Sequence, residues 1–187
     1  MYEIYTDGAT SNNGYDNAVG GWAYVVLKDG LLIHKESGQE KEPKLATNQR
    51  MELTAILRAC EYVNDLDPFA TVKVYSDSAY CINCFKQNWW RAWEKNGWVN
   101  SKKQPVANQD LWAKLIYFYA LAPRYDFCKV KGHSSNVWNN IVDNMAVEAK
   151  KGNFVYKIYL DDGKNWRNAE YITVEYTQNI GKVEERE

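Results

Sequence analysis

Four carboxylates stand in sequence contexts where an acidic side chain could do chemistry. Asp7 directly follows an apolar-alternating run at the N-terminus, and the small residues after it predict a loop. Asp77 directly follows a second strand-like run. If these runs are neighbouring parallel strands, both carboxylates emerge at the same sheet edge, where open α/β sheets place their sites. Glu52 lies in the first turns of a predicted helix, and Asp143 lies inside the last predicted helix. Taken singly, each of the four also fits a turn or a solvated helix surface.

Convergence of all four carboxylates would call for a cation. Ionised carboxylates within a few ångströms repel one another, so one or more of them would otherwise take up a proton. A divalent cation relieves this repulsion, and an all-oxygen ligand set suits Mg²⁺ or Mn²⁺ rather than zinc. The four residues therefore predict a divalent-metal centre, provided that the fold brings them together.

The composition is that of an ordinary globular protein. The chain has 187 residues, a formal net charge of −1 and 45% hydrophobic residues, which predicts one domain or one domain with an appendage. The near-neutral charge does not by itself indicate a nucleic-acid-binding protein. The N-terminus lacks a basic stretch followed by an apolar segment, and no run is long enough to span a membrane. We therefore expect a cytoplasmic protein without a membrane partner.

The four cysteines are Cys60, Cys81, Cys84 and Cys128. Without a secretion signal they are not expected to form disulfides. The pair Cys81 and Cys84 has the spacing of a redox motif, but it lacks the usual flanking aromatic and proline residues. Positions i and i+3 share one helix face, which favours ordinary burial. A zinc site would need a second pair of this kind, which Cys60 and Cys128 do not supply.

The hydrophobic pattern predicts an α/β fold. Strands are expected at 2–6, 20–27, 31–40, 71–75 and 125–130, and helices at 47–65, 78–85, 89–95, 108–119 and 137–151. The first three strands form an antiparallel meander, and the first helix begins at Thr47 as its N-cap. The fourth strand follows a helix and is therefore expected to lie parallel to the first. The result is a five-stranded mixed sheet flanked by helices.

Six stretches carry a family pattern. They are YTDGA (5–9), TNQRMEL (47–53), YSDSAY (75–80), WEKNGW (93–98), QPVANQDLW (104–112) and VKGH…N…D (130–143). In order and spacing they resemble ribonuclease H of the bacterial and eukaryotic type-one class, over roughly residues 1–150. The resemblance implies an RNase H-like fold and cleavage of the RNA strand of an RNA–DNA hybrid, leaving 3′-hydroxyl and 5′-phosphate ends.

The resemblance also implies the catalytic residues. Asp7, Glu52, Asp77 and Asp143 would form a metal-binding tetrad for two Mg²⁺ ions, with Mn²⁺ as an alternative. Two metal ions suit phosphodiester hydrolysis because one acts on the attacking oxygen and the other on the leaving oxygen. His133 would lie in a mobile loop near the metals, where a group that titrates near neutrality can assist proton movement or product release. His133 also fits an ordinary exposed loop histidine.

Polar side chains near these residues are implied to contact the substrate. Asparagine and glutamine amides that both donate and accept suit recognition of the RNA 2′-hydroxyl beside the scissile phosphate. Two positions at predicted helix N-termini, Thr47 and Asn108, match positions that hold a phosphate of the DNA strand. The predicted contacts of these kinds are Asn13, Thr47, Asn48, Gln49, Asn108 and Asn139. Turn formation and exposed first-turn positions are the structural alternatives for Asn13, Asn48 and Gln49.

Residues 86–103 interleave basic and aromatic side chains. Against the single acid Glu94, the basic residues are Lys86, Arg91, Lys95, Lys102 and Lys103. The segment resembles the basic protrusion of the family, which grips the DNA strand. Trp89 and Trp93 match its channel aromatics, with Tyr80 near them. One extra residue around Asn88 leaves open whether Trp90 takes the place of Trp89, and some of these tryptophans, Trp98 among them, also fit helix packing.

We expect a catalytic domain over residues 1–152 and a C-terminal extension over residues 153–187. Alternation at 155–160 and 171–176 predicts a β-hairpin docked on the domain, followed by an acidic end. The expected partner is an RNA–DNA hybrid, and the expected state is a monomer.

The sequence departs from the family pattern in two places. Residue 79 is alanine where some relatives have a polar substrate contact, and the loop after His133 lacks the proline and acidic residue of many relatives. Two other functions remain open: another metal-dependent nuclease of this fold (a retroviral-type RNase H, a transposase or a resolvase), or a non-catalytic nucleic-acid-binding relative. The basic protrusion and His133 argue against the first, and the presence of all four carboxylates argues against the second.

Overall fold

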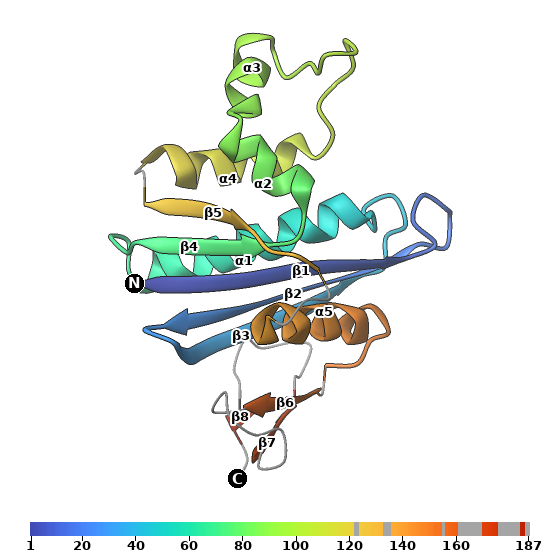
Figure 1. The fold of residues 1–187 in the computed structure, drawn as a ribbon. Coiled ribbons are helices and arrows are strands. Elements are labelled where there is room, and N and C mark those ends of the chain that lie inside the picture. The colour runs from blue at the N-terminus through green and yellow to red at the C-terminus, as the bar shows by residue number, and fades with distance from the viewer. Residues whose placement is uncertain (122–123, 133–135, 155, 161–169, 176–183, 186–187) are drawn as a thin grey trace.

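The computed structural model describes residues 1–121, 124–132, 136–154, 156–160, 170–175 and 184–185 (Figure 1). In chain order its elements are β1 (Tyr2–Ser11), β2 (Val19–Lys28), β3 (Leu31–Glu40), α1 (Asn48–Leu66), β4 (Val72–Ser76), α2 (Ala79–Lys86), α3 (Trp89–Lys95), α4 (Gln109–Leu121), β5 (Tyr125–Lys129), α5 (Val137–Lys150), β6 (Tyr156–Leu160), β7 (Glu170–Glu175) and β8 (Glu184–Glu185). The predicted order of strands and helices is confirmed.

The first five strands form one mixed sheet in the order β3-β2-β1-β4-β5. β1, β2 and β3 pair antiparallel, which confirms the meander. β4 pairs parallel with both β1 and β5, because helices connect these strands and return the chain to the same end of the sheet. The sheet therefore brings the C-terminal ends of β4 and β5 to the same edge.

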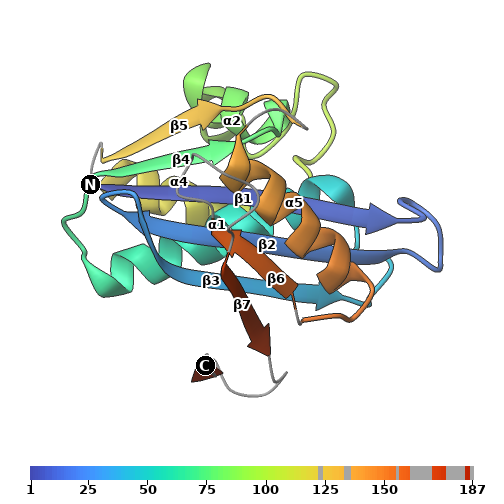
Figure 2. The same ribbon diagram turned by 60° about the horizontal axis from the view of Figure 1, so that its bottom comes forward.

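Helices cover both faces of this sheet. On one face, α1, α2 and α4 bury their apolar side chains against the strands in the larger core, where Trp112 of α4 is fully buried. On the other face, Val142 and Met145 of α5 pack against Ala23 and Val25 of β2. Figures 1 and 2 show α5 on the opposite side of the sheet from α1 and α4, while α3 projects away from the sheet beyond α2.

The first strand is longer than the sequence pattern predicts. The prediction ended it at Thr6, with a loop after Asp7, but β1 continues to Ser11 because it pairs with β2 as far as Ser11 and Val19. Its parallel pairing with β4 ends earlier, at Tyr5 and Tyr75. The predicted loop directly after Asp7 is therefore wrong. Asp7 lies within β1, beyond the point where pairing between β1 and β4 ends.

The long helix α1 forms as its apolar stripe predicts. Leu53, Ile56, Leu57 and Cys60 are all buried against the sheet. The predicted N-cap is also confirmed, since the Thr47 side chain accepts a hydrogen bond from the Arg50 backbone N–H at 3.3 Å. This cap fixes where the helix begins, and it thereby sets the positions of the polar residues in the first turns.

All four cysteines are free thiols. Cys81 and Cys84 are buried in α2, and burial raises the pKa of Cys81 well above its usual range and that of Cys84 to about 12. Thiols this hard to ionise are poor nucleophiles and poor metal ligands. The pair is therefore part of the core, as its helical spacing predicts.

The predicted C-terminal hairpin is present as β6 and β7, which pair antiparallel with Ile158 opposite Ile172. The short strand β8 pairs with β7. β6 lies beside α5 (Figures 1 and 2). Docking of the hairpin onto the catalytic domain stays a prediction.

Candidate active site

Asp7 is the most deeply buried of the four carboxylates. Only 7% of the residue is exposed, and its Oδ1 accepts a hydrogen bond from the Gly8 backbone N–H at 2.7 Å. Burial, and after it the charges of Asp77, Asp143 and Glu52, raise the pKa of Asp7 to about 8. The carboxylates of Glu52 on α1, Asp77 at the β4–α2 junction and Asp143 on α5 therefore all act electrostatically on Asp7 of β1.

Glu52 is brought to Asp7 by a close approach of α1 to β1. A Cβ atom on Gly8 would lie 2.4 Å from the Glu52 backbone nitrogen, so only glycine allows the helix to lie this close to the strand. The Glu52 carboxylate is then held by two donors: the Ser78 hydroxyl on Oε2 and Asn48 Nδ2 on Oε1 at 2.9 Å. Burial raises the pKa of Glu52, while these two hydrogen bonds oppose the rise.

Asp77 lies between β4 and α2, at the sheet edge predicted from the sequence. A Cβ atom on Gly132, which follows β5, would lie 2.5 Å from Asp77 Oδ2. Gly132 therefore leaves room for the carboxylate at the junction of two parallel strands. The charge of Asp77 helps to raise the pKa of both Asp7 and Glu52, so Asp77 acts on two of the other predicted ligands.

The donor chemistry fits a divalent cation. Within the described part of the chain, no group of three or more His, Cys, Asp or Glu side chains is already arranged to hold a metal ion. The four predicted ligands nevertheless offer only oxygen atoms. The pKa of Asp7 is raised by burial and then by the charges of the other carboxylates, and a cation would relieve that repulsion. His133, the fifth predicted catalytic residue, lies outside the described residues.

The predicted minor-groove contacts lie beside Glu52. Asn13 follows β1, and its Oδ1 accepts a hydrogen bond from the Asn48 backbone N–H at 3.3 Å. Asn13, Asn48 and Gln49 are all exposed. Asn48 is thus shared: its side chain supports Glu52 while its backbone anchors the loop that carries Asn13. Asn139 is different, since it is 1% exposed and its side-chain amide has no hydrogen-bond partner in the described structure.

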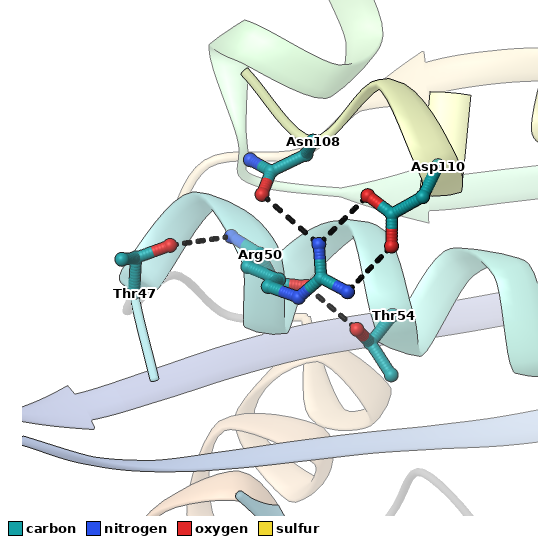
Figure 3. A network of polar contacts seen from close by, with 5 residues as sticks. All are labelled: Thr47, Arg50, Thr54, Asn108 and Asp110. Atoms are coloured by element: carbon teal, nitrogen blue, oxygen red, sulfur yellow. Dashed lines mark hydrogen bonds and ion pairs between the residues drawn. The ribbon is translucent and has the colours of Figure 1, made fainter. Parts of the chain in front are cut away.

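Sequence reasoning missed a polar network between α1 and α4, which Figure 3 shows. Arg50 forms an ion pair with Asp110 through two contacts, at 2.9 and 2.6 Å, and also donates to Asn108 Oδ1 at 3.3 Å. The guanidinium lowers the pKa of Asp110. Arg50 and Asp110 lie in two of the stretches that carry the family pattern, but no sequence pattern indicates that their side chains meet. Ser78 was missed for the same reason.

The basic protrusion, residues 86–103, consists of the last residue of α2, all of α3 and the chain that follows it. Its basic side chains are all exposed: Lys86, Arg91, Lys95, Lys102 and Lys103. Asn88 has a left-handed φ of +54°, and this residue turns the chain between α2 and α3. Asn88 therefore lies in a turn, and α3 starts directly after it.

The aromatic side chains of the protrusion divide into buried and accessible ones. Trp90 is 9% exposed and packs edge-on against Tyr119 in the larger core. Trp89 and Trp93 are half-buried, and Trp93 contacts Trp112. Burial favours Trp89 over Trp90 for the position that the sequence left open, because Trp90 packs in the core and Trp89 is only half-buried; contact of Trp89 with a DNA strand stays a prediction. Tyr80 and Trp98 join the same aromatic cluster.

Comparison with known proteins identifies the family of this chain. Residues 1–151 match the family model described as RNase H. The chain is 45% identical to the ribonuclease H of Thermoanaerobacter sp. (strain X514) over 154 residues, covering 82% of this chain and 92% of the relative. It is also 45% identical to the ribonuclease H of Moorella thermoacetica over 143 residues, covering 76% and 87%. The chain belongs to the RNase H family, and it is a ribonuclease H enzyme.

Solved structures support the fold. The chain superposes on LC9-RNase H1, a type 1 RNase H, with a TM-score of 0.68 and 22% identity, covering 81% of this chain and 72% of that one. It superposes on LC11-RNase H1, solved in complex with an RNA/DNA hybrid, with a TM-score of 0.61 and 21% identity, covering 81% and 98%. No helix in the described residues combines the length and apolarity that crossing a membrane requires.

Proposed function

We propose that this enzyme hydrolyses the RNA strand of RNA–DNA hybrids at a site where Asp7, Glu52, Asp77 and Asp143 hold two divalent metal ions. The observation that carries the proposal is the buried carboxyl of Asp7 at the sheet edge, whose pKa is raised to about 8 by burial and by the charges of Asp77, Asp143 and Glu52. The family relatives and the hybrid bound by LC11-RNase H1 support the substrate class.

The carboxylates act as ligands in this reaction, so no side-chain nucleophile is required. When bound, two Mg²⁺ ions, or Mn²⁺ ions, supply charge neutralisation at the attacking and leaving oxygens of the phosphodiester. Products with 3′-hydroxyl and 5′-phosphate ends follow if the P–O3′ bond breaks. Because the pKa of Asp7 is about 8 without metal, ligation at neutral pH requires this carboxyl to lose its proton. Metal binding should therefore release protons.

Neighbouring residues prepare the ligands. Ser78 and Asn48 donate hydrogen bonds to the two oxygens of Glu52, which fixes the carboxylate and favours its ionised form. Gly8 and Gly132 provide the close approaches that bring Glu52 and Asp77 to the site. We assign His133 the movement of a proton or the release of product, as the family resemblance implies.

Strand selection is assigned to three groups of side chains. The amides of Asn13, Asn48 and Gln49 are exposed beside Glu52, where they can contact RNA 2′-hydroxyls. Thr47 and Asn108 lie at the N-terminal ends of α1 and α4 and are assigned a phosphate of the DNA strand. The exposed lysines and arginine of the protrusion, with Trp89 and Trp93, are assigned a part of the DNA strand beyond the phosphate held by Thr47 and Asn108.

A substrate panel tests this proposal. End-labelled RNA–DNA hybrid, RNA duplex and DNA duplex are incubated with the enzyme in Mg²⁺ or in EDTA. The proposal expects cleavage of the hybrid alone, in its RNA strand alone, and only with Mg²⁺. Equal cleavage of RNA duplex, or cleavage of hybrid in EDTA, would contradict it.

A further inference from the structure

The two residues assigned to a DNA-strand phosphate share one neighbour. Thr47 and Asn108 come from different helix ends, yet both contact Arg50 (Figure 3). The Arg50 backbone N–H donates to Thr47 Oγ1 at 3.3 Å, and its Nη1 donates to Asn108 Oδ1 at 3.3 Å. A single residue therefore occupies an acceptor atom on each of them.

This arrangement decides which atoms remain for a ligand. Because the Asn108 amide oxygen accepts from Arg50, the amide nitrogen points away from Arg50 (Figure 3). No described residue accepts a hydrogen bond from that nitrogen. The Thr47 hydroxyl, which accepts from a backbone N–H, still has its own O–H to donate. Both side chains thus present donors, which are the groups that a phosphate oxygen requires.

Asp110 holds the guanidinium in place. Its two oxygens accept from Arg50 Nη1 and Nη2 at 2.9 and 2.6 Å, and the Arg50 side chain is only 17% exposed. Both Nη1 hydrogens are then committed to Asp110 and Asn108, and the carboxylate neutralises the positive charge. Arg50 is arranged as an anchor within the protein rather than as the cation that meets the substrate.

We propose that Arg50 is a positioning residue for substrate binding, which fixes the Asn108 amide so that its NH₂ group faces a DNA-strand phosphate held jointly with Thr47. The inference rests on the proposed function, since it assumes that these two residues contact that phosphate. The N-terminal ends of α1 and α4, with 19 and 13 residues, meet at this point, and their backbone dipoles favour the same anion.

The experiment combines protein variants with altered hybrids. Each phosphate of the DNA strand is replaced in turn by a neutral methylphosphonate, and kcat and KM are measured for the wild type, Arg50→Gln, Asn108→Ala and the double variant. Arg58→Gln is the matched control, because Arg58 also lies on α1 and pairs with two carboxylates, Glu36 and Glu61. Melting temperatures of all variants are recorded under the assay conditions.

One methylphosphonate position is expected to raise the wild-type KM by about tenfold, since a charge-assisted hydrogen bond is lost there. The penalty is the ratio of KM for the hybrid with this methylphosphonate to KM for the unmodified hybrid. Asn108→Ala and Arg50→Gln should each lower this ratio, and by a similar amount. The double variant should reduce it no further, because Arg50 acts through Asn108. The kcat value at saturating hybrid should stay near wild type, and Arg58→Gln should keep the full penalty.

Three outcomes would overturn the inference, and they are distinguishable. If Arg50→Gln keeps the wild-type penalty while Asn108→Ala loses it, the phosphate contact stands and the positioning role falls. If the double variant lowers the methylphosphonate penalty by the sum of the two single effects, Arg50 contacts the phosphate itself. A wild type with no sensitive position would overturn the DNA-strand contact together with the inference. If Arg50→Gln melts below the assay temperature, Arg50→Lys replaces it, with an intermediate penalty expected because an ammonium cannot form the same fork.

Discussion

Replacing Asp7 by asparagine should stabilise the metal-free protein. The folded state raises the pKa of Asp7 from 3.8 to about 8, chiefly through burial and then through the charge of Asp77. Between these values the unfolded chain has lost the proton that the folded protein keeps, so raising the pH favours unfolding. The loss of folding free energy caused by the Asp7 carboxyl is absent near pH 4, grows with pH and levels off above pH 8. Asparagine has the same shape, keeps an oxygen that can accept from Gly8 and carries no charge.

The size of the effect follows from the two pKa values. Each pH unit between 3.8 and 7 adds about 1.4 kcal/mol, which gives up to about 4 kcal/mol at pH 7. Urea unfolding of the wild type and Asp7→Asn in EDTA, at several pH values from 4 to 8, measures it directly. Asp16→Asn, which changes an exposed carboxylate near the same strand, is the control.

The expected result is a stability gain for Asp7→Asn that increases as pH rises and shrinks when Mg²⁺ is added, because only the wild type gains ligand binding from the metal. A gain that does not depend on pH would refute the argument. So would a loss of stability at pH 7 in EDTA. Either result would mean that Asp7 is not held among repelling carboxylates.

Three further predictions concern the surroundings of the site. Ser78→Ala removes a hydrogen bond that lowers the pKa of Glu52, so that pKa should rise and half-maximal activity should need a higher pH or more Mg²⁺; an unchanged pH profile of the Mg²⁺ requirement would contradict this role. Trp89→Ala combined with Trp93→Ala should weaken hybrid affinity by about 1–3 kcal/mol for each stacked base lost, measured by fluorescence anisotropy at two salt concentrations, and unchanged affinity would assign both to packing. A chain truncated after Gly152 should still cleave hybrid with Mg²⁺ at a lower melting temperature; a folded but non-binding truncation would make the extension a substrate-binding element.

Periodic patterns predicted most of the fold. The α1 stripe of Leu53, Ile56 and Leu57 faces the sheet because spacing of three and four residues puts these side chains on one helix face. The extent of β1 could not be predicted in this way. Small residues after Asp7 are typical of a loop, whereas here Gly8 admits a neighbouring helix and the strand is held by β2.

The candidate site was predictable in its residue types and not in its geometry. The sequence indicated the four carboxylates, and in the folded chain the charges of Asp77, Asp143 and Glu52 help to raise the pKa of Asp7. The support by Ser78, and the pairing of Arg50 with Asp110, depend on side chains that approach only after the helices pack. The sequence left open which of Trp89 and Trp90 is accessible to a DNA strand, because burial depends on how α3 packs; Trp90 is the one that lies in the core.

Cleavage of labelled hybrid by Asp77→Asn, compared with the wild type at saturating Mg²⁺ and substrate, tests the central claim most directly. Asp77 follows β4 at the sheet edge, and its charge raises the pKa of Asp7 and of Glu52, so removing that charge should leave the variant folded. It should retain hybrid binding and lose RNA-strand cleavage almost entirely, because a neutral amide is a poor ligand for a divalent metal ion. Near-wild-type turnover by this folded variant would contradict the assignment of the carboxylate tetrad.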